Sequence, residues 1–224
     1  MTLSDRASRE GEPAQHPEGG DDRSLDRGVA RRQAFLKSAR EVFLECGFEG
    51  ASVNEIVRRA GGSLATLYTQ YGNKEGLFLA VAQDQNDRFV RDILPFCEAD
   101  LPLEEGLQVM GEQLLRALLT RDNLAFYRII VGEGRQFPQL LQRFVGVGAE
   151  RVRGLVAAYV RARAQKEGIE IHDPEASAAY FLDIVRSRHH YLSLANPEYA
   201  LSSDELSTHV RAAVRFFLNG ALPR

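Results

Sequence analysis

The sequence is poor in residues that crosslink a chain or hold a metal, since only two of its 224 residues are cysteines. Cys46 and Cys97 make neither a disulfide framework nor a metal cluster, and both fall in apolar helical patterns typical of reduced core residues. His189 and His190 are adjacent and point about 100° apart on a helix, so they lack the spacing of a chelating pair. No metal site is therefore expected, and one histidine is expected to make a polar contact in a pocket or an interface.

The sequence also lacks long apolar runs and the motifs of common enzymes. No stretch of about 18 apolar residues exists, so we expect no membrane partner. The N-terminus is polar, glycine-rich and acidic rather than a signal peptide, which favours a cytoplasmic location. Neither a glycine-rich phosphate loop after a strand nor a serine nucleophile elbow occurs, so the sequence predicts no enzyme and no cofactor.

Sustained alternation of apolar and polar residues, which would indicate β-strands, is absent as well. Apolar residues recur at helical spacing instead, which predicts an all-α fold of about nine helices. We expect one long helix from Pro138 to about Glu167 and the end of another helix at Pro95. A chain of this length suits one or two domains with a sizeable core.

Charge and composition divide the chain into three parts. Residues 1–28 carry a net charge of −3 and almost no large apolar side chains, so we expect a disordered tail. Residues 29–76 carry +2 and are the only net-positive part, and their first helix is expected from Val29 to Glu45. Residues 77–224 carry −2 and read as helical throughout.

Residues 52–74 carry the most informative pattern, two short helices joined by a glycine turn and followed by the start of a third. Ser52 with Glu55 three residues later is a capping box at a helix start. Gly61 stands where a helix ends in the left-handed conformation, which only glycine enters without steric cost. Ser63 then caps the next helix. This is the helix-turn-helix layout, in which the second helix enters the major groove of DNA.

The stretch from about Arg31 to Val81 resembles the DNA-binding domain of the tetracycline-repressor (TetR) family. It departs from the family pattern at Gly62, where valine or isoleucine is usual, and we expect this glycine to loosen the turn. Ala65 replaces a glycine, and Gln70-Tyr71 replaces His-Phe, which changes the bases that are read. The matching pieces are Ala39-Arg40-Glu41-Val42-Phe43, Gly47-Phe48, Ser52-Val53-Asn54-Glu55-Ile56, Ala60-Gly61-Gly62-Ser63, Thr66-Leu67-Tyr68, Tyr71 and Lys74-Glu75-Gly76-Leu77.

A second, more local resemblance lies in the run from Tyr127 to Pro138, which is similar to the C-terminal domains of the AefR-like branch of this family. Four glycines lie in or after this run, at 132, 134, 146 and 148. Each costs about 1 kcal/mol against alanine inside a helix. We therefore expect the helices to break there or to pack very close to a neighbour.

The resemblance implies that residues 29–76 bind DNA and that residues 77–224 bind an effector and dimerise. It implies a ligand-responsive transcriptional regulator, a repressor released from a palindromic operator by a small molecule. Two alternatives stay open, a DNA-binding protein controlled by a protein partner and a helical carrier or enzyme that lost DNA binding. The tail could also reach the minor groove as an arm, although its acidity argues against this.

The resemblance further implies which side chains meet DNA. Phosphate contacts position such a module, and base-edge contacts specify the sequence. Asn and Gln side chains suit adenine, and the methyl groups of Ala and Thr suit thymine. Ser52 and Ser63 act as helix caps in any case. The expected DNA-contact set is Ser52, Asn54, Ser63, Leu64, Ala65, Thr66, Tyr68, Thr69, Gln70 and Lys74.

Helical bundles bind ligands between facing helices, so large side chains of the C-terminal part are candidates for the lining of a pocket that takes a largely apolar effector. Core filling is the alternative for each of them. Arg128, Glu133 and Arg186 are candidate polar anchors, or members of surface salt bridges. The expected pocket set is Phe89, Met110, Phe126, Tyr127, Ile130, Phe137, Tyr159 and Tyr180.

The last two long helices carry apolar stripes, and in the resembling family such helices pair with their copies. A homodimer would hold two DNA-binding modules about one turn of DNA apart, which a weakly basic module needs. A monomer would bury the stripes internally instead. The expected interface set is Phe181, Val185, His189, Leu192, Leu206, Val210, Ala213, Val214 and Phe217.

Overall fold

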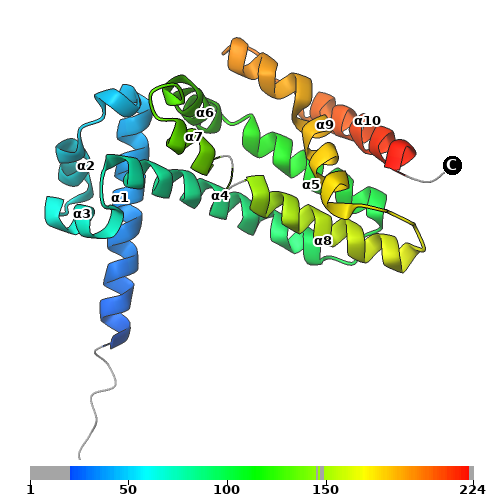
Figure 1. The fold of residues 1–224 in the computed structure, drawn as a ribbon, viewed down its shortest axis with the longest axis horizontal. Helices are drawn as coiled ribbons and strands as arrows, with labels where there is room; N and C mark the ends of the chain where they lie inside the picture. The colour runs from blue at the N-terminus through cyan, green and yellow to red at the C-terminus, as the bar shows by residue number, and fades with distance from the viewer. Residues whose placement is uncertain (1–20, 145, 147–148, 222–224) are drawn as a thin grey trace, which may run out of the picture.

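The computed structural model describes residues 21–144, 146 and 149–221, which form ten helices and no strand (Figure 1). The expected all-α fold is confirmed, and none of the described helices is long and apolar enough to cross a membrane. The helices are α1 (Asp21–Gly50), α2 (Val53–Ala60), α3 (Leu64–Tyr71), α4 (Lys74–Glu98), α5 (Leu103–Leu118), α6 (Arg121–Glu133), α7 (Pro138–Phe144), α8 (Glu150–Glu167), α9 (Pro174–Ala195) and α10 (Ser203–Ala221).

Two groups of helices meet along α4. Figure 1 shows α1 at one end of the molecule with α2 and α3 beside it, while α4 leads away from them along α8. In the second group, α8 packs against α9, and α10 packs against both α5 and α9. The helix α6 contacts α1, α5 and α9, so it lies where the two groups meet.

The N-terminal core is built from aromatic rings of helices far apart in sequence. The ring of Phe78 in α4 lies 4.9 Å from that of Phe43, edge to face, and 5.2 Å from that of Phe48. Phe126 of α6 stacks on Phe78 with a centroid distance of 4.6 Å and an angle of 11° between the rings. Ile130 of α6 is fully buried in the same cluster. The core beneath the helix-turn-helix therefore includes α6 as well as α1 to α4.

The C-terminal core corrects the expected dimer interface. Phe181 of α9 packs against Phe217 of α10 with ring centroids 5.5 Å apart, and both side chains are buried within one chain. The apolar stripes face α5 and each other, because a single chain already supplies the partner surface that we assigned to a second copy. The buried members of the expected set, all 5% exposed or less, are Phe181, Val185, Leu206, Val210, Ala213, Val214 and Phe217.

The two remaining members of that set are half-buried. The Nδ1 atom of His189 lies 2.6 Å from the hydroxyl of Tyr199, and the rings of His189 and His209 meet edge to face at 4.3 Å. His209 donates from Nε2 to the carbonyl of Val185 at 2.9 Å. Leu192 lies partly exposed on α9. These contacts join α9 to α10 within one chain.

Several helix boundaries differ from the expected ones. The tail was predicted to be disordered through residue 28, but residues 21–28 form the first turns of α1, while residues 1–20 lie outside the described part. Gly47 has the positive φ (72°) expected at a helix end, yet helical turns continue to Gly50. Pro95 was expected to end α4 but lies inside its last turn, where its carbonyl still accepts from the N–H of Ala99 at 3.0 Å.

The glycines after Tyr127 have different surroundings. The helix expected from Pro138 to Glu167 is two helices, since α7 ends at Phe144 and α8 begins at Glu150, with Gly146 between them. A Cβ atom on Gly134, just after α6, would lie 2.9 Å from Leu141, so this glycine permits a close approach. Gly132 lies inside α6 and has no such neighbour, and residue 148 lies outside the described part.

Gly62 tightens the helix-turn-helix turn rather than loosening it. The ring of Phe35 in α1 is fully buried and lies so close that a Cβ atom on Gly62 would be 2.3 Å from its Cζ atom. Tyr71 holds that ring from another side, edge to face at 6.3 Å. Arg31 of α1 also donates to the carbonyl of Gly61. The missing side chain is therefore what lets α1 support the turn.

Replacing Gly62 with alanine should destabilise the protein, because the buried Phe35 ring must move to admit the methyl group. Overpacking of this kind costs about 1–3 kcal/mol, and a chain of this size loses roughly 2–4 °C in Tm per kcal/mol. Gly132→Ala is the matched control, since its methyl group meets nothing within 4 Å and alanine favours a helix. Thermal unfolding followed by circular dichroism measures both. An unchanged Tm for Gly62→Ala would contradict the proposed role of this contact.

Candidate DNA-binding face and ligand cavity

The turn between α2 and α3 is fixed by backbone and capping interactions. Gly61 adopts the left-handed conformation (φ 67°, ψ 31°) and its N–H bonds to the carbonyl of Val57, as expected for a helix end. The Ser63 hydroxyl accepts from the N–H of Thr66 at 3.1 Å and lies 2.9 Å from the Thr66 hydroxyl. The fully buried Leu67 then anchors α3 in the N-terminal core. These contacts hold α3 in one orientation on α1.

The opposite side of α3 is open to solvent. Leu64 is 38% exposed and Tyr68 47% exposed, and the side chains of Ala65, Thr69 and Gln70 are exposed as well. Leu64, Ala65, Tyr68 and Thr69 form one helix face because they recur at spacings of one, four and five residues, and Gln70 lies about 100° beyond Thr69 around the helix. The helix α3 carries no charged side chain. This face therefore offers hydrogen-bonding groups and methyl groups of the kind that read base edges.

The remaining members of the expected DNA-contact set flank this face. Ser52 and Asn54 are exposed at the start of α2, while Thr66 is half-buried because its hydroxyl meets Ser63. Lys74 is also half-buried. Its ammonium group donates to the carbonyl of Glu49 at 2.8 Å and lies 5.0 Å over the ring of Phe48. Lys74 thus secures the end of α1, and its other two N–H bonds face no partner that the structure describes.

The basic side chains of α2 are partly neutralised by neighbouring acids. Arg58 and Arg59 both donate to Glu55, and these hydrogen bonds lower the pKa of the Glu55 carboxyl to about 2. Arg59 also pairs with Glu45 at 2.7 Å. Because Glu55 binds the arginines, the expected capping box is only half formed, through the Glu55 N–H and the Ser52 hydroxyl at 3.5 Å. Arg58 remains 72% exposed and is the freer of the two charges.

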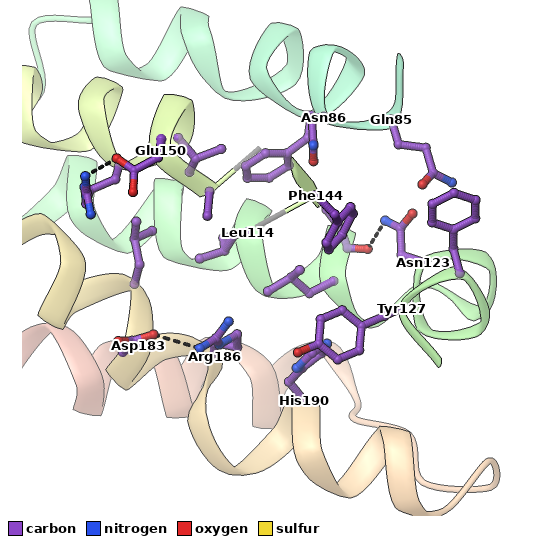
Figure 2. Close-up of a pocket in the computed structure, with 18 of the residues that line it drawn as sticks. Gln85, Asn86, Leu114, Asn123, Tyr127, Phe144, Glu150, Asp183, Arg186 and His190 are labelled. Atoms are coloured by element: carbon purple, nitrogen blue, oxygen red, sulfur yellow. Dashed lines mark hydrogen bonds and ion pairs between the residues drawn. The ribbon is translucent and has the colours of Figure 1, made fainter. Parts of the chain in front are cut away.

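A cavity of about 420 Å³ lies between α4, α5, α6, α8 and α9 (Figure 2). Its walls are largely apolar, and Phe144 at the end of α7 closes one side. The lining consists of Gln85, Asn86, Phe89, Leu114, Ala117, Leu118, Asn123, Phe126, Tyr127, Phe144, Ala149, Glu150, Val152, Arg153, Ala179, Leu182, Asp183, Arg186 and His190.

Three members of the expected pocket set, Phe89, Phe126 and Tyr127, line this cavity, and the other five do not. Met110 and Tyr159 are buried in the C-terminal core, where the Tyr159 hydroxyl donates to the carbonyls of Leu101 and Pro102. Ile130 and Phe137 pack in or against the N-terminal core. Tyr180 is 66% exposed on the surface. The set therefore needs correction, because helical spacing alone does not tell which buried face a neighbouring helix covers.

Of the candidate polar anchors, only Arg186 reaches the cavity. Arg128 points to the end of α9 instead, where it donates to the carbonyls of Ser193 at 2.7 Å and Leu194 at 3.1 Å. Glu133 is not among the lining residues. The amides of Gln85, Asn86 and Asn123 line the cavity but were not predicted from the sequence, because no hydrophobic pattern distinguishes them.

Charged side chains at the cavity occur as pairs. Glu150 pairs with Arg153 on α8, and Asp183 pairs with Arg186 on α9 at 2.9 Å (Figure 2). All four side chains are at least 38% exposed, so the pairs stand at the solvent side of the cavity. The lining thus carries no net charge when the histidine is neutral.

His190 is the buried polar residue of the cavity wall. It is 2% exposed, and its ring meets that of Tyr127 edge to face at 4.9 Å. Burial, with a smaller contribution from Arg186, lowers the pKa of His190 to about 4, so the imidazole is neutral at physiological pH. The Nδ1 atom of His190 and the Nε2 atom of Gln85 are both buried without a hydrogen-bond partner among the described residues.

The helix α6 links the cavity to the helix-turn-helix. Asn123 and Tyr127 line the cavity, and Phe126 both lines it and stacks on Phe78 of the N-terminal core. At the start of α6, Asp122 pairs with Arg40 of α1 at 2.8 Å. A displacement of α6 would therefore reach α1 and α4 directly.

Two protein-family models match this chain. Residues 35–81 match the tetR family of bacterial regulatory proteins, and residues 105–220 match the C-terminal domain of AefR-like transcriptional repressors. A helix-turn-helix transcriptional repressor of Mycobacterium tuberculosis is 29% identical over 165 residues, which cover 72% of this chain and 81% of that protein. Matches to two other curated repressors span only 36% and 34% of those proteins' length.

Solved structures give the same result over nearly the whole chain. A TetR-family regulator from Mesorhizobium loti superposes with a TM-score of 0.76 at 25% identity, covering 88% of this chain and 99% of that one. The flavonoid-responsive regulator FrrA superposes with a TM-score of 0.69 at 28% identity, covering 87% and 98%.

Proposed function

Because the chain belongs to the TetR family of bacterial transcriptional regulators, we propose that it represses transcription as a homodimer on a near-palindromic operator. A small molecule that fills the cavity releases it from DNA. The observation that carries this proposal is the rigidly mounted, exposed face of α3, joined through α6 to a largely apolar cavity. A protein with a DNA partner of this kind works in the bacterial cytoplasm.

The composition of α3 and its surroundings supports sequence-specific rather than purely electrostatic binding. Since α3 is uncharged and Arg59 is neutralised by Glu45 and Glu55, few charges are available to bind phosphates. Backbone N–H groups at the N-termini of α2 and α4 supply further phosphate contacts. Tyr68 on the exposed face of α3 and Lys74 beside that face complete the phosphate contacts. One such module binds weakly, so a second copy on the same operator is needed.

The exposed side of α9 and α10 is the surface that we propose for the dimer, in place of the buried stripes. Tyr180 and Tyr191 of α9 are 66% and 60% exposed, and Phe216 of α10 is 70% exposed. Large exposed aromatic side chains on neighbouring helices favour a protein–protein contact. Ile184, between the two tyrosines on α9, is partly exposed as well.

Release by a ligand requires that the cavity and α3 share a mobile element. A ligand shifts an equilibrium only through its different affinities for the two states, and the coupling is typically about 1–3 kcal/mol. The helix α6 suits this role because Phe126 belongs to the cavity wall and to the N-terminal core at once. The relative FrrA is named as flavonoid-responsive, which supports a small-molecule effector here too. The relatives support neither control by a protein partner nor a carrier or enzyme.

Substitutions of exposed residues on α3 should weaken DNA binding without unfolding the protein. On an operator selected from a random DNA pool, Tyr68→Phe removes one hydrogen bond to a charged phosphate, which lowers affinity roughly tenfold. Gln70→Ala should relax the preference at one base pair by about 1–3 kcal/mol. Gln165→Ala on α8, also an exposed glutamine, is the control. Electrophoretic mobility shifts measure both effects, and wild-type affinity and specificity in both variants would remove these residues from the DNA contact.

The dimer surface has its own test. Phe216→Arg places a charge in the proposed contact and should shift the protein toward monomers in sedimentation velocity, with reduced operator affinity. Val131→Arg is the matched control, since Val131 on α6 is also an exposed apolar residue, at 50%. A Phe216→Arg protein that sediments as the wild-type dimer would rule this surface out.

A further inference from the structure

We propose that the cavity takes an uncharged, mostly aromatic molecule whose polar atoms are held by Gln85 and His190. The inference rests on the proposed function, because this molecule is the one that releases the operator. It goes further by naming the chemical class of the effector and the two side chains that select it.

The shape and composition of the walls favour ring systems. Aromatic side chains come from three helices, Phe89 from α4, Phe126 and Tyr127 from α6, and Phe144 from the end of α7. Rings that meet such side chains edge to face or offset are stabilised beyond the effect of burial alone. A volume of about 420 Å³ lies within the range that buries molecules of drug size.

The charges of the cavity disfavour an ionised ligand. Each acidic side chain of the lining already has its arginine, Glu150 with Arg153 and Asp183 with Arg186. A carboxylate or an ammonium group would lose its hydration inside the cavity and find no unpaired opposite charge. The neutral His190 ring carries no charge that could pair with such a ligand.

The polar atoms of the wall indicate what an uncharged ligand must carry. The amide N–H groups of Gln85 need an acceptor, such as a carbonyl oxygen, and the neutral imidazole of His190 pairs with a hydroxyl group. A buried polar atom left without a partner destabilises the protein, and a ligand that supplies the partner recovers that free energy. Both nitrogens lie beneath the surface of the cavity wall, and a half-turn about the terminal side-chain torsion, which is roughly two-fold, would turn each of them toward a ligand.

Figure 2 shows Asn86 and Asn123 on the same side of the cavity as Gln85, with His190 on the opposite wall beside Arg186. Asn123 is already engaged, because its amide donates to the carbonyl of Ala117 at 2.6 Å. Among the lining side chains, Gln85 and His190 are those with a buried nitrogen that has no hydrogen-bond partner among the described residues. A hydroxylated aromatic ketone meets both, and its rings fill the apolar remainder.

The test is isothermal titration calorimetry of the full chain with three probes at about pH 6.5, where phenols are protonated. Naringenin is the uncharged hydroxylated aromatic ketone, 4-hydroxycinnamate is an aromatic anion, and decanoate is an aliphatic anion. We expect naringenin to bind at least tenfold more tightly than either anion. Tighter binding of an anion would overturn the proposal.

Two variants that keep side-chain size test the assigned groups. Gln85→Met and His190→Phe should each weaken naringenin binding about tenfold, the equivalent of one hydrogen bond. Gln165→Met and His172→Phe make the same changes at exposed positions and should bind as the wild type does. Equal naringenin affinity in the wild type and both cavity variants overturns the assignment.

Mobility shifts on the selected operator, run with the same proteins, separate this inference from the proposed function. A protein that binds its operator but none of the aromatic probes overturns the ligand class while the regulator function stands. A wild-type protein that binds naringenin but no operator overturns the regulator function, while the ligand class stands. Release of the operator by naringenin, reduced in Gln85→Met and His190→Phe, supports both.

Discussion

The stack of Phe126 on Phe78 is the interaction on which the rest of the structure depends. It places a ring of α6, the helix that lines the cavity, inside the core that supports the helix-turn-helix. Because cores are close-packed, Phe126 cannot move without a response from Phe78 and its neighbours on α1. The pair of Asp122 with Arg40 adds a second link, from α6 to α1. The cavity and the DNA-binding face are thus two ends of one packed unit.

The same unit explains why the chain tolerates unsatisfied groups in its interior. Buried polar atoms without partners are rare and costly, and of the four among the described residues, those of Gln85 and His190 lie at the cavity wall while those of Arg40 and Ser193 do not. Local rules are most often broken at functional sites, where a ligand supplies what the fold lacks. The exposed face of α3 also depends on groups outside itself. Because α3 is uncharged, its affinity for DNA comes from helix N-termini and from a second copy of the chain more than from its own side chains.

Features with local causes were predictable from the sequence, and features set by tertiary packing were not. Gly61 and Ser63 end and begin their helices as predicted, because caps are decided by a few neighbouring residues. The apolar stripe of Phe181 and Val210 was recognised but assigned to the wrong partner, since periodicity shows that a face is buried and not what buries it. Gly62 was expected to loosen the turn, but the ring of Phe35 packs directly against it, a contact that the sequence does not show. The sequence did not show which histidine would make a polar contact in a pocket, because the packing of α6 on α9 decides that it is His190.

The most direct measurement of the central claim is hydrogen–deuterium exchange of the full chain with and without its selected operator. Coupling between two sites is reciprocal, so DNA held by α3 must change the protection of the helix that the ligand uses. We expect operator binding to slow exchange in α6, residues 121–133, as well as in α3, with little change in the distal turns of α8. A change confined to residues 21–76 would contradict the account, because α6 would then carry nothing between the cavity and the DNA.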